Sequence, residues 1–203
     1  LGPGNDDDGV DLNRNYSVNW IFGDAFDTQD FGSCNPSYIT NFDYYRGSAP
    51  FSESEVQAIR DFAIEKQFLL SIAYHSSRSG CVSEKVISSW LWEPDKPAPD
   101  YDIITRLGEQ IAGLIPKETE SGTYQPAKSI SRKGNAHDWF YKATGCFQYL
   151  IEVGTENIQP NSPFLIEDTV GRNMDSVMYL LMRAAGISDE DGPDKYQITG
   201  LIT

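Results

Sequence analysis

Long apolar runs are absent from this sequence of 203 residues. The longest ones, Phe68 to Tyr74 and Phe147 to Val153, are much shorter than the roughly 20 residues that an α-helix needs to cross a bilayer. We therefore expect no membrane span.

Basic residues are also scarce, since 16 Lys and Arg stand against 30 Asp and Glu and give a formal net charge of −14. The basic residues form no cluster along the chain. Phosphate groups and anionic lipid headgroups repel a protein of this charge. We therefore expect no nucleic-acid partner and no binding to anionic membranes.

Cysteine and the usual signs of a chain start are limited too. The three cysteines, Cys34, Cys81 and Cys146, have no metal-type spacing and allow one disulfide, for which Cys34 and Cys81 are candidates, plus one buried thiol. The sequence does not fix this pairing. It opens on loop-like residues 1–8 with no Met and no signal-peptide pattern, which predicts that the chain begins inside a domain.

What the sequence does contain is the alternation of helical and strand patterns expected of one globular domain. Ser52 to Glu55 has the form of a capping box, and apolar residues then repeat at helical spacing. An apolar stripe of Met174, Val177, Met178 and Leu181 predicts the buried face of the last helix. The expected helices cover about 52–66, 103–115 and 164–185, and the expected strands cover 68–74, 85–92 and 146–153.

Other stretches lack this regularity. Gly122 to Asn135 has no periodicity and predicts a surface loop. Residues 187–203 predict an acidic linker followed by the first strand of a β-sandwich. Strands that alternate with helices predict an α/β fold with helices on both faces of the sheet.

Two polar residues stand at the ends of predicted buried strands. Ligands of open α/β sheets bind outside the carboxyl ends of the strands, where His75 and Glu152 are expected. A carboxylate in an apolar strand is costly unless it is paired, near a metal or protonated, so Glu152 is a candidate general base. The alternatives are a hydrogen-bonded structural histidine and a buried ion pair, for example between Glu152 and Arg14.

A third group lies near the start of the chain, where Arg14 is flanked by Asn13 and Asn15. A guanidinium can bind a carboxylate through two hydrogen bonds, and the neighbouring amides can add further ones. This segment is therefore a candidate carboxylate clamp.

Five segments, taken in order, resemble the M14 zinc carboxypeptidase family through about Gly186. They are GVDLNRNY at 9–16, YRGSAPFSESE at 45–55, the strand ending in His75-Ser76, GNAHDWFY at 134–141 and IEVGT at 151–155. The resemblance implies a mixed, mostly parallel central sheet, N-terminally incomplete, with a partial catalytic domain over residues 1–186.

The resemblance also implies roles for individual residues. His75 corresponds to the third ligand of a single zinc ion, and Glu152 to the catalytic glutamate. Asn13 and Arg14 correspond to the pair that holds the terminal carboxylate of a peptide, and Arg14 also polarises the scissile carbonyl. Ser76 and His137 are expected to contact the substrate, and His137 at the specificity pocket favours a polar or acidic side chain there.

The sequence departs from the family at two places. The family's first two zinc ligands come from a His-x-x-Glu motif, but the only histidines here are His75 and His137, and neither has Glu three residues later. We expect these two ligands upstream of Leu1, so that this fragment alone is inactive. Ile130 occupies the position of the family's mobile tyrosine, which Tyr124 replaces only if the loop is rearranged.

Three functions remain open. The leading one is a zinc carboxypeptidase that acts on peptides with a free C-terminus, secreted or periplasmic by resemblance. A related zinc acylase would act on N-acyl amino acids instead. A non-catalytic peptide-binding module would keep the pocket without the metal. Retention of Asn13, Arg14, His75 and Glu152 favours the enzyme.

Overall fold

A computed structural model describes residues 9–21, 45–76, 83–89, 96–127, 133–155 and 161–187. The proposed Cys34–Cys81 disulfide, Ile130 and the strand expected near the C-terminus lie outside these residues. Cys146 lies within them and is a buried thiol, as expected.

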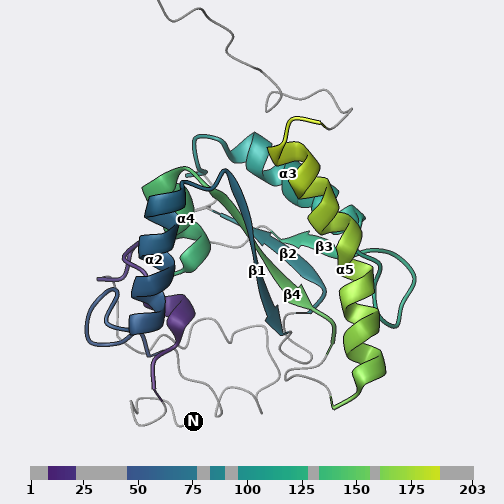
Figure 1. Ribbon diagram of the computed structural model, residues 1–203, viewed down its shortest axis with the longest axis horizontal. Coiled ribbons are helices and arrows are strands. Elements are labelled where there is room, and N and C mark those ends of the chain that lie inside the picture. The colour runs from purple at the N-terminus through teal and green to yellow at the C-terminus, as the bar shows by residue number, and fades with distance from the viewer. Residues whose placement is uncertain are drawn as a thin grey trace, which may run out of the picture.

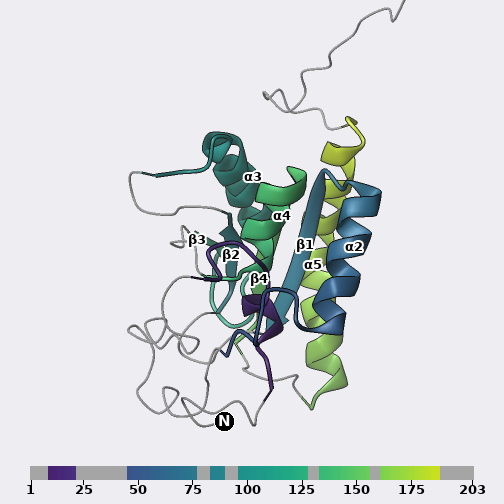
Figure 2. The same ribbon diagram turned by 90° about the vertical axis from the view of Figure 1, so that its left-hand side faces the viewer.

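The centre of the fold is a sheet of four strands. These are β1 (Leu70–Ser76), β2 (Lys85–Ser88), β3 (Gln125–Ala127) and β4 (Phe147–Val153). Their order is β1-β4-β2-β3, which can be followed in Figure 2. The pairs β1–β4 and β2–β3 are parallel, whereas β2–β4 is antiparallel. The mixed, mostly parallel sheet predicted above is therefore confirmed.

Helices cover both faces of this sheet. They are α2 (Ser54–Lys66), α3 (Tyr101–Gly113), α4 (Ala136–Thr144) and α5 (Pro163–Ala184), with a short 3₁₀ turn η1 (Leu12–Arg14). Figure 1 shows α2 and α4 on one side of the sheet and α3 and α5 on the other. Among the described helices, none is long and apolar enough to cross a membrane.

The sheet separates two apolar cores because successive residues of a strand point to opposite faces. On the α3 side, Tyr149 and Ile151 of β4 pack with residues of α3 such as Leu107. On the other side, Trp139 and Phe140 of α4 pack with Tyr16 and with residues of α2. Side chains of β4 at positions 148, 150 and 152 therefore face α2 and α4.

The first predicted helix is confirmed, but its capping box is not. No side chain caps α2, whose N-cap residue is Glu53. The Ser52 hydroxyl instead donates to Glu53 Oε1 at 2.7 Å and accepts from Asn15 Nδ2 at 2.9 Å. The Ser52 hydroxyl, which the local pattern predicted to cap α2, is therefore used in a tertiary contact with Asn15.

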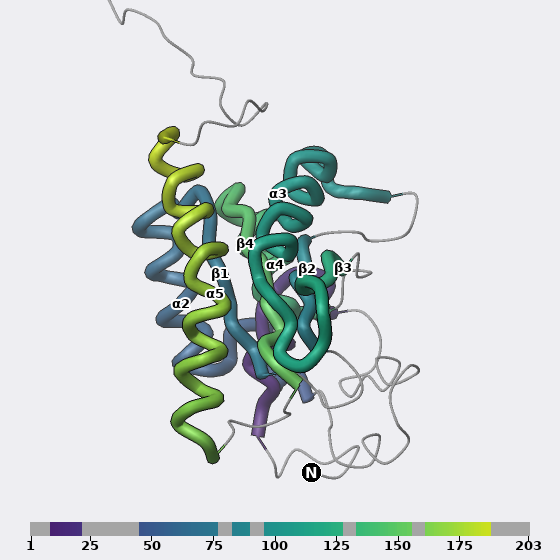
Figure 3. The backbone as a smooth tube through the Cα atoms, turned by 90° about the vertical axis from the view of Figure 1, so that its right-hand side faces the viewer, coloured from purple at the N-terminus to yellow at the C-terminus, as the bar shows by residue number. Residues whose placement is uncertain are grey.

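The predicted buried face of the last helix is wrong. Of the four predicted residues, Met174, Met178 and Leu181 are 48%, 48% and 58% exposed and only Val177 is partly buried. Helix α5 instead buries the side that carries Asn173, Ser176, Tyr179 and Leu180. Figure 3 shows α5 beside β1. The expected loop at 122–135 contains β3, and α4, which the periodicity did not predict, begins directly after it.

Candidate active site

His75 and Glu152 lie side by side on neighbouring strands. In the parallel register of β1 and β4, His75 is opposite Glu152, one position before the pairing ends at Ser76 and Val153. Residues opposite each other in neighbouring strands point to the same face of the sheet. Glu152 is 6% exposed and His75 is partly buried. The imidazole and the carboxyl group therefore share one face at the carboxyl ends of both strands.

That face is the one covered by α2 and α4. Gln148, four residues before Glu152 on the same strand, donates from Nε2 to Ser71 Oγ at 3.1 Å. A pocket of about 400 Å³ opens on this face. Its polar lining includes Asn13, Ser71, His75 and Gln148, and its apolar lining comes from Leu12, Tyr16, Ile59, Phe62, Ala63, Phe68, Ile72, Ala73, Ala136 and Phe140.

Arg14 is held beside this face by its own neighbours. Only 8% of the residue is exposed. Its Nη1 donates to Asn135 Oδ1 at 2.9 Å and to the carbonyl of Asn13 at 2.8 Å. The guanidinium is thereby fixed in orientation before any ligand binds, which reduces the entropy that binding would cost.

The turn that carries Arg14 is joined to the start of α4. Asn13 Oδ1 accepts from the backbone N–H of Ala136 at 2.9 Å, and Asp11 accepts from the N–H of Asn13 at 2.9 Å. Gly134 has a φ of +75°, and a Cβ there would lie 2.0 Å from the carbonyl oxygen of Arg14. Only glycine permits this approach.

Asn15 does not take part in the predicted carboxylate clamp. It is fully buried, and its Nδ2 donates to the carbonyls of Arg46 and Ala49 and to Ser52 Oγ, while its Oδ1 accepts from the N–H of Glu53. A side chain with all these partners holds the segment before α2. Asn13 and Arg14 remain as the candidates for binding a carboxylate.

The charges around His75 fit the role of a neutral ligand. Burial lowers the pKa of His75, the carboxylate of Asp11 raises it and the guanidinium of Arg14 lowers it. Both charged groups are thus close enough to act on the imidazole. A metal binds the neutral form of histidine, which this environment favours at neutral pH.

The described residues supply only part of a zinc site. Within them, no group of three or more His, Cys, Asp or Glu side chains converges in a way that could hold a metal ion. A catalytic zinc normally has three protein ligands. His75 fits one ligand position, and the set is otherwise incomplete in this part of the chain.

Of the predicted site residues, Asn13 and His75 line the pocket, whereas Arg14, Glu152, Ser76 and His137 do not. Ser76 is exposed at the end of β1, and His137 is 3% exposed on α4 with its Nε2 3.7 Å from Asp138 Oδ1. Neither residue lines the pocket described above. Tyr124, the alternative to the family's mobile tyrosine, is 1% exposed, and its hydroxyl accepts from the N–H of Gly154 at 2.9 Å.

Three residues of the site were not singled out in the sequence. Asn135 holds Arg14, Asp11 acts on His75, and Gln148 lines the pocket. The period of two along β4 would have placed Gln148 on the face of Glu152. No local signal joins Asn135 to Arg14, which is 121 residues away.

Comparisons with known proteins bear on the family and the fold of this chain. The zinc carboxypeptidase family model, Peptidase M14, matches residues 3–174. A search of curated proteins found no match. Among solved structures, the carboxypeptidase A of Helicoverpa armigera superimposes with a TM-score of 0.62 at 22% sequence identity, over 90% of this chain and 43% of that chain.

The structural neighbour shows the fold, and this chain spans less than half of its length. The family model is the stronger finding, since it covers most of the 203 residues and includes all the segments at the pocket face. The chain belongs to the M14 zinc carboxypeptidase family.

Proposed function

We propose that these residues form part of a zinc metallocarboxypeptidase that removes the C-terminal residue of a peptide, with Glu152 as the general base and His75 as a zinc ligand. The observation that carries this proposal is the register of β1 and β4, which sets His75 opposite Glu152 on the pocket face. The general base and the zinc ligand must lie close together, because the base takes its proton from the water that the zinc holds.

Glu152 takes a proton from the attacking water and passes it to the leaving amine. Zinc, when bound, lowers the pKa of that water and polarises the scissile carbonyl. Burial of Glu152 at 6% exposure limits competition from bulk water. The carboxylate therefore acts in an environment of low dielectric constant, where electrostatic interactions are stronger.

Arg14 and Asn13 bind the free carboxylate of the peptide. A guanidinium presents two parallel N–H groups to a carboxylate, and Asn135 already holds that of Arg14 in place. Arg14 also stabilises the negative charge that develops on the carbonyl oxygen. A peptide without a free C-terminus lacks the group that this pair recognises.

The other two zinc ligands are proposed to come from polypeptide outside these 203 residues. The chain has two histidines, and His137 is buried on α4 beside Asp138. Within the described sheet, β1 is an edge strand, and the unpaired side of an edge strand can accept another strand. This fragment alone is then inactive, and secretion of the whole protein is proposed on family resemblance.

The test uses the full-length protein with zinc and one peptide in two forms, with a free and with an amidated C-terminus. We expect turnover of the free form and loss of nearly all turnover for the amidated form. Glu152→Gln lowers kcat by roughly 10²–10⁴-fold with zinc content unchanged. Glu167→Gln, at an exposed position on α5, is the matched control and keeps full activity.

Other outcomes point to the other functions. Hydrolysis of N-acyl amino acids without peptide cleavage would identify an acylase. Peptide binding without turnover in zinc-loaded protein would identify a non-catalytic module. Full activity of Glu152→Gln would remove Glu152 from the mechanism.

A further inference from the structure

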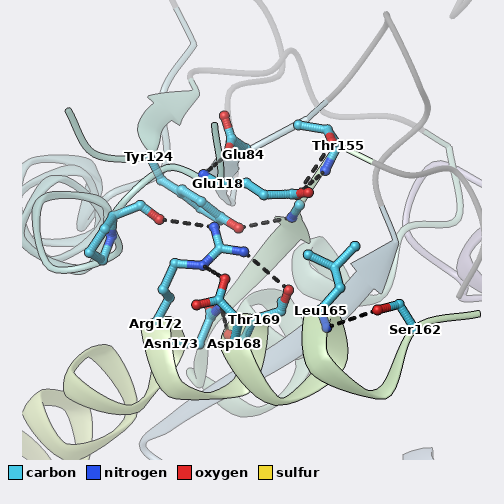
Figure 4. A network of polar contacts seen from close by, with 12 residues as sticks. Glu84, Glu118, Tyr124, Thr155, Ser162, Leu165, Asp168, Thr169, Arg172 and Asn173 are labelled. Carbon is cyan, nitrogen blue, oxygen red and sulfur yellow. Dashed lines mark hydrogen bonds and ion pairs between the residues drawn. The ribbon is translucent and has the colours of Figure 1, made fainter. Parts of the chain in front are cut away.

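Where β4 ends, side chains rather than neighbouring strands bind the backbone N–H groups. The pairing of β4 with β2 stops at Lys85 and Glu152, and its pairing with β1 stops at Ser76 and Val153. The next two backbone N–H groups are bound by side chains from elsewhere. Gly154 donates to the hydroxyl of Tyr124 at 2.9 Å, and Thr155 donates to Glu118 Oε2 at 3.0 Å, as Figure 4 shows.

Glu118 makes a second contact with the same residue. The Thr155 hydroxyl donates to Glu118 Oε2 at 3.3 Å. Gly154 has a φ of +65°, and a Cβ at this position would lie 3.0 Å from that same oxygen. The glycine is therefore required both for its left-handed conformation and for the close approach of Glu118.

Both holding side chains come from the segment between α3 and β3, which is itself held in place. The N–H of Tyr124 donates to the carbonyl of Ile115 at 2.9 Å, and the N–H of Glu118 donates to Glu84 Oε1 at 2.6 Å. Glu84 is 7% exposed and directly precedes Lys85, the partner of Glu152 in the sheet. Glu84 thus connects the segment that carries Glu118 to β2, the strand that pairs with Glu152.

Helix α5 supports this segment from outside. Arg172 forms an ion pair with Asp168 at 2.9 Å, donates to Thr169 Oγ1 at 3.2 Å and reaches the carbonyl of Pro116 at 3.4 Å. Figure 4 shows this arginine beside Tyr124. The side chains that bind the end of β4 are therefore attached to the sheet and to α5.

We propose that Glu118 and Tyr124 are positioning residues that fix the carboxyl end of β4 and thereby the place of the Glu152 carboxylate beside His75. The inference rests on the proposed function of Glu152. Their hydrogen bonds act two and three residues beyond Glu152, where the strand ladder has ended. A base that is misplaced by about 1 Å can lose roughly 10²-fold in rate, so such an anchor affects kcat.

The test measures kcat, KM and zinc content of the full-length enzyme. Tyr124→Phe removes the acceptor for Gly154, and Glu118→Ala removes the acceptor for Thr155. We expect each to lower kcat by about 10- to 100-fold, with KM and zinc content within about twofold of the wild type. Glu118→Gln keeps an oxygen acceptor and recovers most of kcat.

Two matched controls separate positioning from general damage. Tyr141→Phe also loses a tyrosine hydrogen bond, to Asp100 Oδ2 at 2.9 Å, and keeps kcat. Gly154→Ala and Gly145→Ala both place alanine at a left-handed φ, +65° and +75°, but a Cβ at Gly145 has no atom within 4 Å. Only Gly154→Ala is expected to lower kcat.

Wild-type kcat in Tyr124→Phe and Glu118→Ala, together with a lower unfolding temperature, would mean a purely structural role and would overturn the inference. If Glu118→Ala does not fold, Glu118→Gln and the glycine pair decide the question, since equal kcat for the two alanine variants also overturns it. The proposed function fails separately, through a fully active Glu152→Gln enzyme.

Discussion

At the scale of single residues, Asn13 and Asn15 have different roles although both flank Arg14 in the sequence. Asn13 carries its side chain to the pocket and to the start of α4, whereas Asn15 is fully buried among the backbone groups before α2. Because the chain turns at η1, the side chains of Asn13 and Asn15 point in different directions although they are only two positions apart. The sequence predicts a carboxylate clamp here but does not tell which amide faces the pocket.

Tyr16 gives a pH-dependent prediction at the same scale. Its ring packs against Phe51 and Trp139, and burial raises its pKa to about 12 from 10.0. The folded state therefore holds the proton more tightly than the unfolded state. Stability from this group is fully present below pH 10 and is lost as the pH rises toward 12.

Comparison with Tyr16→Phe checks this. The difference in free energy of unfolding between wild type and variant, measured by urea titration, should be constant up to about pH 9. It should then shift against the wild type by about 2–3 kcal/mol between pH 10 and pH 12. A difference that does not change over this range would contradict the raised pKa.

At the scale of elements, α5 shows that an apolar stripe marks a helix without fixing its orientation. The stripe through Met174, Met178 and Leu181 is exposed in the structure, and the helix packs on the sheet through Tyr179 and Leu180. Polar Asn173 and Ser176 are buried on the same side, where the Asn173 side chain interacts with Tyr124 and the Ser176 hydroxyl with Tyr74 of β1. Hydrophobicity alone could not predict this choice.

Two alanine variants of the 203-residue chain test the orientation of α5. Leu180→Ala should cost about 2–5 kcal/mol because it leaves a cavity in the core. Met178→Ala should cost less than about 1 kcal/mol, since the residue is 48% exposed. Urea unfolding measures both, and a larger cost for Met178→Ala would reverse the assigned face.

At the scale of the whole molecule, the charge of −14 predicts a dependence on ionic strength. Like charges repel more strongly in the compact state than in the unfolded chain, and salt screens this repulsion. Raising NaCl from about 10 mM to about 300 mM, which shortens the Debye length from about 30 Å to under 10 Å, should raise the unfolding midpoint at pH 7.

The control for this prediction is the same titration at a pH closer to the pI of 4.4, where the net charge is smaller. There the effect of NaCl should shrink. A midpoint at pH 7 that falls with added NaCl would show that attractive ion pairs outweigh the net repulsion.

Local patterns determined much of this protein. The spacing of apolar residues was enough to predict α2, α3, α5, β1, β2 and β4, because hydrophobic periodicity and strand-like runs depend on neighbours within a few residues. Strand-end positions also singled out His75 and Glu152. These two features predicted an α/β fold and the two residues at the centre of the candidate site, whereas the mixed, mostly parallel sheet followed from the resemblance to the family.

Only the tertiary structure decided which groups meet. The register of β1 and β4 sets His75 opposite Glu152 across 77 positions of sequence, and Arg14 is held by Asn135 from 121 residues away. The bonds of Tyr124 and Glu118 to the end of β4 likewise join distant segments. Such contacts depend on how the sheet and its helices pack. Packing involves residues that are far apart in the sequence, so a pattern of neighbouring residues cannot predict it.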